Sequence, residues 1–327
     1  MSTAPWSRRS ARLGVAVAAV VALSLGLSAC GSDDAGGAGS PPSGASEGTT
    51  DLATQPQLVP DFEPDAELVA LLPQEIRDAG SVATATSVGL APINFPGADG
   101  DEVKGLNADL IAAVEQLLGL EFDSEIYPST AAQLLALDSG RVALTTSTNG
   151  DTAERQQKYD FVDTLISGNV LLVAAGNPQH IEAATDVCGR AFGEVKGSFS
   201  LLSVIQEVCA DAGLDEPELS TFDDVPAMQL ALTSGRIDTY IGSDFSVVWD
   251  QSQGQRVEAV ELPEAGDLVL GWTLLKGNDG LRDAVAGALQ RLVEDGYYDE
   301  AFERWGLTPN KIAPGVNVGD QASGFGA

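Results

Sequence analysis

Two patterns of apolar and polar residues alternate along the chain from about residue 66 to residue 307. Short apolar runs bounded by glycine, proline or serine predict strands, and longer stretches with apolar residues three or four apart predict helices. The predicted strands cover residues 81–88, 121–127, 141–147, 168–175, 190–195, 219–222, 237–242 and 268–276. The predicted helices cover residues 105–119, 130–138, 199–212, 225–233, 244–251, 281–295 and 299–305. This alternation indicates an α/β fold with mostly parallel sheets flanked by helices.

The pattern restarts at about residue 176, so we expect two α/β units. With 327 residues, of which 44% are hydrophobic, the chain is long and apolar enough to form two cores. Arg141-Val142-Ala143 and Arg236-Ile237-Asp238 both follow a Ser-Gly pair at the end of a predicted helix. We interpret this as a weak similarity between two lobes and not as a repeat array.

The first 30 residues have the pattern of a targeting signal. Arg8, Arg9 and Arg12 precede an apolar run over residues 13–27, and Cys30 follows small residues. This arrangement looks like a bacterial lipobox, in which a signal peptide of residues 1–29 is removed and the cysteine is lipidated. An uncleaved membrane helix is the alternative, although the run is short for one.

The segment after Cys30 is rich in glycine, serine and proline and lacks apolar periodicity. Such a composition is typical of a flexible linker. We therefore expect residues 30–62 to tether a folded body to the extracytoplasmic face of the cell membrane. The lipid would be its only contact with the membrane.

Acidic residues outnumber basic ones by 48 to 17, and the formal net charge is −31. A surface of this sign repels phosphate groups, which excludes nucleic-acid binding and attraction to anionic lipid. The sequence has one histidine, His180, which we interpret as a surface residue, and no nucleophile–base pair or metal-ligand spacing. We expect neither enzymatic activity nor a cofactor or metal.

The cysteines also bear on the compartment. If Cys30 is lipidated, Cys188 and Cys209 remain, and an oxidising compartment would allow them to pair. They flank a predicted strand–turn–helix unit, whose returning helix would bring its end near the start of the strand. A disulfide of this loop length would contribute about 3 kcal/mol to stability. Two separately buried thiols are the alternative.

Residues 147–163 contain the first candidate for ligand chemistry. Asp151 and Glu154 have the spacing of a helix capping box, and Arg155 follows one turn into that helix. A guanidinium beside a helix N-terminus is well suited to bind a carboxylate through paired hydrogen bonds. A surface capping box with an ion-paired arginine is the alternative interpretation.

Six motifs occur in one order between residues 66 and 307. They are Ala91-Pro92-Ile93-Asn94-Phe95, Gly105-Leu106-Asn107-Ala108-Asp109-Leu110, Ser147 through Asp160-Phe161-Val162, Leu171-Leu172-Val173 with Gly176-Asn177-Pro178, Ser234-Gly235-Arg236-Ile237-Asp238, and Asp295-Gly296-Tyr297-Tyr298. Together they resemble the extracellular solute-binding proteins, family 3, of bacterial polar-amino-acid ABC importers. The cysteine pair looks like one in actinobacterial members.

The resemblance implies a two-lobed periplasmic-binding-protein fold of type II, with a hinge of two crossing strands. The crossings would fall near residues 174–176 and 266–270. A ligand would bind in the cleft between the lobes and close the hinge. The implied division is 66–174 with 271–310 for lobe 1, 175–268 for lobe 2, and a loosely ordered tail over 311–327.

The resemblance also implies roles for individual residues. Arg155 matches the arginine that binds the ligand carboxylate, and Ser147 and Thr148 match small polar residues that contact the ligand. Ser198 and Phe199 match a turn of lobe 2 whose N–H groups meet the same carboxylate.

Other matches depart from the family pattern. Ser243 stands where an aspartate usually binds the ligand amine, and Asp244, one residue later, is the partner we favour. Ser87, Leu90 and Thr130 occupy positions where the family often has an aspartate or aromatic residues. A pocket lined by these three residues argues against lysine or arginine as the ligand.

The resemblance implies that the chain captures an amino acid or related small carboxylate and presents it to the permease subunits of an ABC importer, as a monomer. One alternative is an enzyme of the same fold that dehydrates a small carboxylate. Another is a ligand-sensing partner of a membrane receptor. Saturable binding of amino acids that an arginine-to-alanine change at position 155 abolishes would support the binding protein, and turnover of prephenate-like substrates would support the enzyme.

Overall fold

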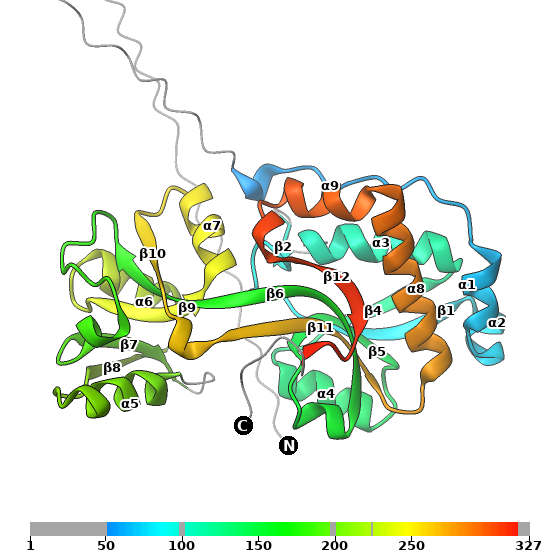
Figure 1. Cartoon of the computed structure of the whole chain (residues 1–327). Helices are drawn as coiled ribbons and strands as arrows, with labels where there is room; N and C mark the ends of the chain where they lie inside the picture. The colour runs from blue at the N-terminus through cyan, green and yellow to red at the C-terminus, as the bar shows by residue number, and fades with distance from the viewer. Residues whose placement is uncertain (1–50, 98–101, 197–200, 224, 320–327) are drawn as a thin grey trace, which may run out of the picture. The chain divides into compact units, whose positions relative to one another are not determined.

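The structure is a computed structural model that describes residues 51–97, 102–196, 201–223 and 225–319. Its elements form two groups, which we call lobe 1 and lobe 2, joined by two long strands (Figure 1). The predicted α/β class is confirmed, since parallel strands lie in sheets flanked by helices in both lobes.

Lobe 1 is built on a sheet in the order β4-β1-β5-β11-β6. Its strands are β1 (Ser81–Thr86), β4 (Glu121–Ile126), β5 (Leu144–Gly150), parts of β6 (Tyr159–Ala174) and β11 (Asp267–Leu275), and β12 (Lys311–Val316), with a small pair β2 (Phe95–Pro96) and β3 (Val103–Lys104). Its helices are α1 (Ala66–Leu71), α2 (Gln74–Ala79), α3 (Leu106–Leu118), α4 (Thr130–Asp138), α8 (Asp279–Asp295) and α9 (Tyr297–Arg304). Strand β1 runs parallel to β4 and β5, so the carboxyl ends of all three meet at one edge.

Lobe 2 continues the strand order as β6-β9-β7-β8. Its strands are β7 (Ala191–Val195), β8 (Glu218–Phe222), β9 (Thr239–Ser243) and β10 (Val257–Glu261), and its helices are α5 (Leu202–Ala212), α6 (Val225–Thr233) and α7 (Asp244–Ser252). Strand β7 is parallel to β8 and β9. Lobe 2 therefore has a second edge where the carboxyl ends of strands meet.

The connection between the lobes is formed by β6 and β11, which pair antiparallel with each other. Strand β6 pairs with β11 up to Gly168 and with β9 from Asn169 onward. The first crossing therefore lies at these two residues, earlier than the predicted 174–176, because β6 is one continuous strand from Tyr159 to Ala174. Strand β11 starts at Asp267, inside the predicted second crossing at 266–270.

The largest core lies in lobe 1, where α3, α8 and α9 pack together. Helix α3 presents Leu106, Leu110 and Leu117 to this core, in keeping with the helical spacing in the sequence. Trp272 of β11 is fully buried, and its ring N–H donates to the Asn107 Oδ1 atom at 3.2 Å. Trp272 is thus a residue of the lobe 1 core.

Two predicted boundaries are wrong. Residues 52–62 do not continue the tether, because the Leu58 N–H donates to Asp109 at 2.9 Å and the Phe62 N–H donates to Gln116 at 2.8 Å. Residues 311–316 are not loosely ordered, because they form β12 on the edge of β6. Both segments are held by partners far away in the sequence, which local composition does not indicate.

Cys188 and Cys209 form a disulfide with a Cα–Cα distance of 5.6 Å. Cys188 precedes β7, and Cys209 lies near the end of α5. The predicted pairing is therefore confirmed, and it links the entry of a lobe 2 strand to the helix that returns over it.

Candidate functional site

A group of polar side chains lies at the carboxyl edge of the lobe 1 sheet. Ser87 follows β1 and Ser147 lies in β5, and their hydroxyl oxygens are 3.0 Å apart. Thr130, the first residue of α4, donates from its hydroxyl to Asn149 Oδ1 at 3.1 Å. Ligands of α/β proteins bind at this edge of a sheet, where loops expose polar groups. The structure thus pairs two of the predicted site residues, Ser87 and Ser147, and places Thr130 against Asn149, two residues further along β5.

Arg155 extends this polar edge. Its Nη1 atom donates to the carbonyl oxygen of Gly150, the last residue of β5, at 2.8 Å. The side chain is half-buried, and among the described residues the guanidinium makes no ion pair. A guanidinium has five N–H donors, so one hydrogen bond leaves donors for a bidentate carboxylate contact.

The predicted helix with Asp151 as its N-cap is wrong. The chain forms a short 3-10 turn over Arg155–Gln157, and Asp151 is fully buried. Its carboxylate accepts hydrogen bonds from Gln156 Nε2 and from the Gly319 N–H, both at 2.8 Å. Asp151 therefore accepts a hydrogen bond from the C-terminal segment instead of capping a helix. The capping-box interpretation of Arg155 falls with it.

A second buried carboxyl lies beside Asp151. Asp163 of β6 accepts a hydrogen bond from the Val318 N–H at 2.8 Å. Burial, and secondly the charge of Asp151, raises the pKa of Asp163 to about 8. Asp163 is thus protonated at neutral pH, and a neutral acid here avoids two buried negative charges in contact.

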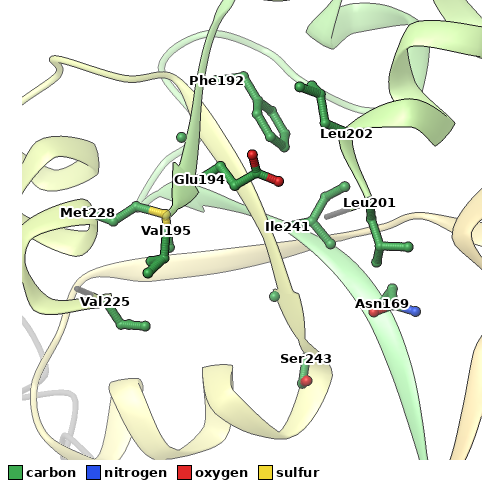
Figure 2. Close-up of a pocket in the computed structure, with 12 residues that line it drawn as sticks. Asn169, Phe192, Glu194, Val195, Leu201, Leu202, Val225, Met228, Ile241 and Ser243 are labelled. Carbon is green, nitrogen blue, oxygen red and sulfur yellow. The ribbon is translucent and has the colours of Figure 1, made fainter. Parts of the chain in front are cut away.

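Lobe 2 contains a pocket of about 310 Å³ at the carboxyl edge of β7 and β9. Figure 2 shows its walls, which are mostly apolar. The lining residues are Asn169, Phe192, Gly193, Glu194, Val195, Leu201, Leu202, Val225, Met228, Ile241, Gly242 and Ser243. The volume lies at the small end of the range typical of ligand sites. Of these residues, the prediction named Ser243 alone.

Asp244 does not line this pocket, whereas Ser243 does. The Asp244 carboxylate accepts from the Gly168 N–H at the hinge and from Asn310 Nδ2 at 2.8 Å. Burial raises the pKa of this carboxyl, and these hydrogen bonds oppose the shift. The structure therefore uses Asp244 to tie the start of α7 to the hinge. The preference for Asp244 as partner of the ligand amine is not supported by this placement.

Two further predicted site residues, Leu90 and Thr148, have other surroundings. Leu90 packs against the lobe 1 core, and the Thr148 hydroxyl is buried without a hydrogen-bond partner among the described residues. Ser198, Phe199 and Cys30 lie outside the described residues.

The pocket residues that the sequence prediction missed have one recognisable signal. Glu194 follows an apolar residue and a glycine near the end of a predicted strand. An acid at the carboxyl end of a strand is exposed to a ligand edge in an α/β fold. Asn169 and Ile241 carry no comparable signal, because their positions depend on where β6 changes partners.

Across residues 51–319, as far as they are described, no cluster of three or more His, Cys, Asp or Glu side chains is arranged to hold a metal ion. In the same part of the chain, every helix is too short or too polar to cross a membrane.

The sequence and structure are similar to those of known proteins. Residues 82–308 match the family model of bacterial extracellular solute-binding proteins, family 3. The arginine-binding protein ArgT of Corynebacterium glutamicum is 26% identical over 266 residues, which cover 77% of this chain and 82% of that protein. The L-cystine-binding protein TcyJ of Escherichia coli K12 is 28% identical over 233 residues, covering 71% and 84%.

A solved structure shows the same architecture. It is that of the ancestral amino acid-binding protein AncCDT-1, described as a precursor of cyclohexadienyl dehydratase. It superposes with a TM-score of 0.58 at 25% identity, over 72% of this chain and 99% of that one. The match of the family model over most of the folded part, together with this fold, establishes that the chain belongs to the bacterial extracellular solute-binding proteins, family 3.

Proposed function

We propose that the chain is the substrate-binding component of an ABC importer and captures an amino acid or related small carboxylate. The observation that supports this most directly is Arg155, whose guanidinium contacts the end of β5 at Gly150 and pairs with no described acid, while the Ser87–Ser147 hydroxyl pair lies earlier on the same strand edge. A fork of N–H donors next to hydroxyl groups is suited to a carboxylate. The relatives bind arginine and L-cystine, as their names state.

Ligand binding would change how the two lobes are arranged about the hinge. Ligand contacts to both lobes would favour a closed arrangement about β6 and β11, and a permease would recognise that arrangement. Lipidation of Cys30 would hold the protein at the extracytoplasmic face of the membrane, with residues 31–50 as tether. The protein would act as a monomer without a cofactor or metal.

The test is titration calorimetry of the full-length chain in detergent with L-arginine, L-cystine, L-glutamine and the other proteinogenic amino acids. At least one should bind saturably, and Arg155→Ala should remove that binding. Arg141→Ala is the matched control, because Arg141 also lies in lobe 1 but pairs with Glu125 at the surface, with its side chain 64% exposed. Absence of binding throughout this panel would refute the amino-acid function.

A second candidate is a dehydratase acting on a small carboxylate, favoured by the likeness to a precursor of cyclohexadienyl dehydratase. Turnover of prephenate by the purified chain, abolished by Arg155→Ala, would support it. A ligand-sensing partner of a membrane receptor differs from the importer component only in the protein that docks. Capture of the ligand-loaded chain by permease subunits would separate these two roles.

A further inference from the structure

The lobe 2 pocket has one charged group on an otherwise apolar or neutral wall. Glu194 is the one ionisable side chain among the described residues that line it. Figure 2 shows its carboxylate directed toward the space between Phe192, Leu202 and Ile241. A carboxylate in apolar surroundings loses hydration, and a bound cation compensates for that loss.

No described residue supplies that cation. Lys196, two residues along the chain, forms an ion pair with Asp223 at 2.7 Å, and both side chains are largely exposed. Among the described residues, Glu194 forms no ion pair in which a lysine or arginine neutralises it. Its side chain is half-buried, so it is held at the pocket wall and remains accessible from the pocket.

A further acid near this edge, Asp244, already makes hydrogen bonds within the protein. The Asp244 carboxylate accepts hydrogen bonds from the Gly168 N–H and from Asn310. Ser243, and not Asp244, lines the pocket. A serine hydroxyl does not neutralise an ammonium group. Among the described residues that line the pocket, Glu194 is thus the one carboxylate offered to a ligand.

We propose that Glu194 binds a cationic nitrogen of the ligand, while Leu202 and Ile241 contact its apolar part. This inference rests on the proposed solute-binding function and narrows the ligand to amino acids or amines with an apolar segment. It excludes simple carboxylates that lack a positive charge. The cation is the α-ammonium group if the ligand is neither lysine nor arginine, as Ser87, Leu90 and Thr130 indicate, and a charged side chain otherwise. The two sources share the same chemistry at Glu194.

The test compares the wild-type full-length chain with Glu194→Gln in titrations with four probes. The probes are L-arginine, L-citrulline, which has a neutral side chain of similar shape, L-glutamine, and 5-guanidinopentanoate, which lacks the α-amine. Glu194→Gln should weaken binding of L-arginine, or of L-glutamine if only that probe binds, by about 10- to 100-fold, the range expected when a charged hydrogen bond is lost.

The probes then identify the nitrogen. If Glu194 binds the α-ammonium group, the substitution weakens L-citrulline and L-glutamine and leaves 5-guanidinopentanoate unchanged. If it binds a side-chain cation, the substitution weakens 5-guanidinopentanoate and leaves L-citrulline and L-glutamine unchanged. Either pattern supports the proposal.

The control is Glu218→Gln, which makes the same charge change in lobe 2 at the opposite end of the strands, where Glu218 pairs with Ala191. Equal affinities of wild type and Glu194→Gln for every probe that binds overturn the proposal and leave the solute-binding function intact. If the wild-type chain binds none of the four probes and no other amino acid of the panel, both the proposal and the solute-binding function are overturned. Thermal unfolding of each variant at the wild-type temperature shows that the fold is retained.

Discussion

The two lobes present different chemistry at equivalent edges of their sheets. The lobe 1 edge is polar and already hydrogen-bonded, as in the Ser87–Ser147 and Thr130–Asn149 pairs. The lobe 2 edge is a mostly apolar pocket in which Glu194 is the one carboxylate among the described lining residues. We infer that lobe 1 binds the ligand carboxylate, and that lobe 2 contacts a cationic nitrogen and the apolar part of the ligand.

Acidic side chains also lie near the hinge, outside the two sheet edges. Asp244 ties α7 of lobe 2 to Gly168 and to Asn310 of the lobe 1 side. Asp151 and Asp163 are buried and accept hydrogen bonds from the backbone N–H groups of Gly319 and Val318. Acids near the hinge therefore serve the fold, whereas the acid in the pocket is left for a ligand.

The largest expected effect comes from opening the covalent link in lobe 2. Replacing Cys188 and Cys209 together by alanine should lower the free energy of unfolding by about 3 kcal/mol, because the unfolded chain regains loop freedom. Hydrogen exchange should show faster exchange in α5 and β7 than in the wild type, while α3 and α8 keep their protection. Equal acceleration in both lobes would contradict the view that the lobes are separately stabilised.

Asp244→Ala should act on stability more than on ligand contact. Loss of its hydrogen bonds to Gly168 and Asn310 should lower the free energy of unfolding by about 2 kcal/mol, since buried donors lose their partner. Ligand affinity should change by less than the change that Glu194→Gln produces. Chemical denaturation and calorimetry measure the two effects. A loss of binding without a loss of stability would restore Asp244 as the partner of the ligand amine.

Asp163 should make lobe 1 sensitive to pH. Its pKa is raised above the unfolded value of 3.8 to about 8, so the folded chain holds a proton that the unfolded chain releases. This contribution to stability is complete below about pH 4 and is lost as the pH rises through about 8. Asp163→Asn, which keeps a neutral side chain, should reduce the fall in unfolding temperature between pH 6 and pH 9. An unchanged slope would show that Asp163 is ionised in the folded chain.

The smallest expected effect is that of Ser87→Ala. Its hydroxyl contacts the Ser147 hydroxyl at 3.0 Å, and removing it should weaken ligand binding by about 1 kcal/mol. Ser139→Ala, which removes a serine hydroxyl at the far end of α4, should leave affinity unchanged. If Ser139→Ala weakens binding as much as Ser87→Ala does, the polar edge is not the ligand surface.

The sequence predicted those elements whose determining residues lie within a few positions of one another. Helix α4 spans Thr130–Asp138 as predicted, with Ser129 as its N-cap, because spacing and cap lie within the same few residues. Strand β12 was missed, because Pro314 and Gly315 interrupt its apolar pattern and its partner β6 lies far away in the sequence. The disulfide was predicted correctly from the strand–turn–helix order around it.

The site was predicted in part for the same reason. Ser87 and Ser147 were identified by their match to family positions, and each lies at the end of a predicted strand. Asp244 was preferred over Ser243 because a carboxylate suits an amine, yet the start of α7 turns it toward the hinge. Which of two adjacent residues faces a pocket depends on the helix start and on Asn310, and neither is encoded within a short motif.

The central claim is that Arg155 of lobe 1 binds the ligand carboxylate. Its most direct test is to titrate wild type and Arg155→Ala with the best-binding amino acid and with the carboxamide of the same amino acid. The wild-type chain should prefer the acid by about 100-fold, the scale of a paired charged hydrogen bond, and Arg155→Ala should remove that preference. An Arg155→Ala chain that still prefers the acid by the same factor would contradict the account.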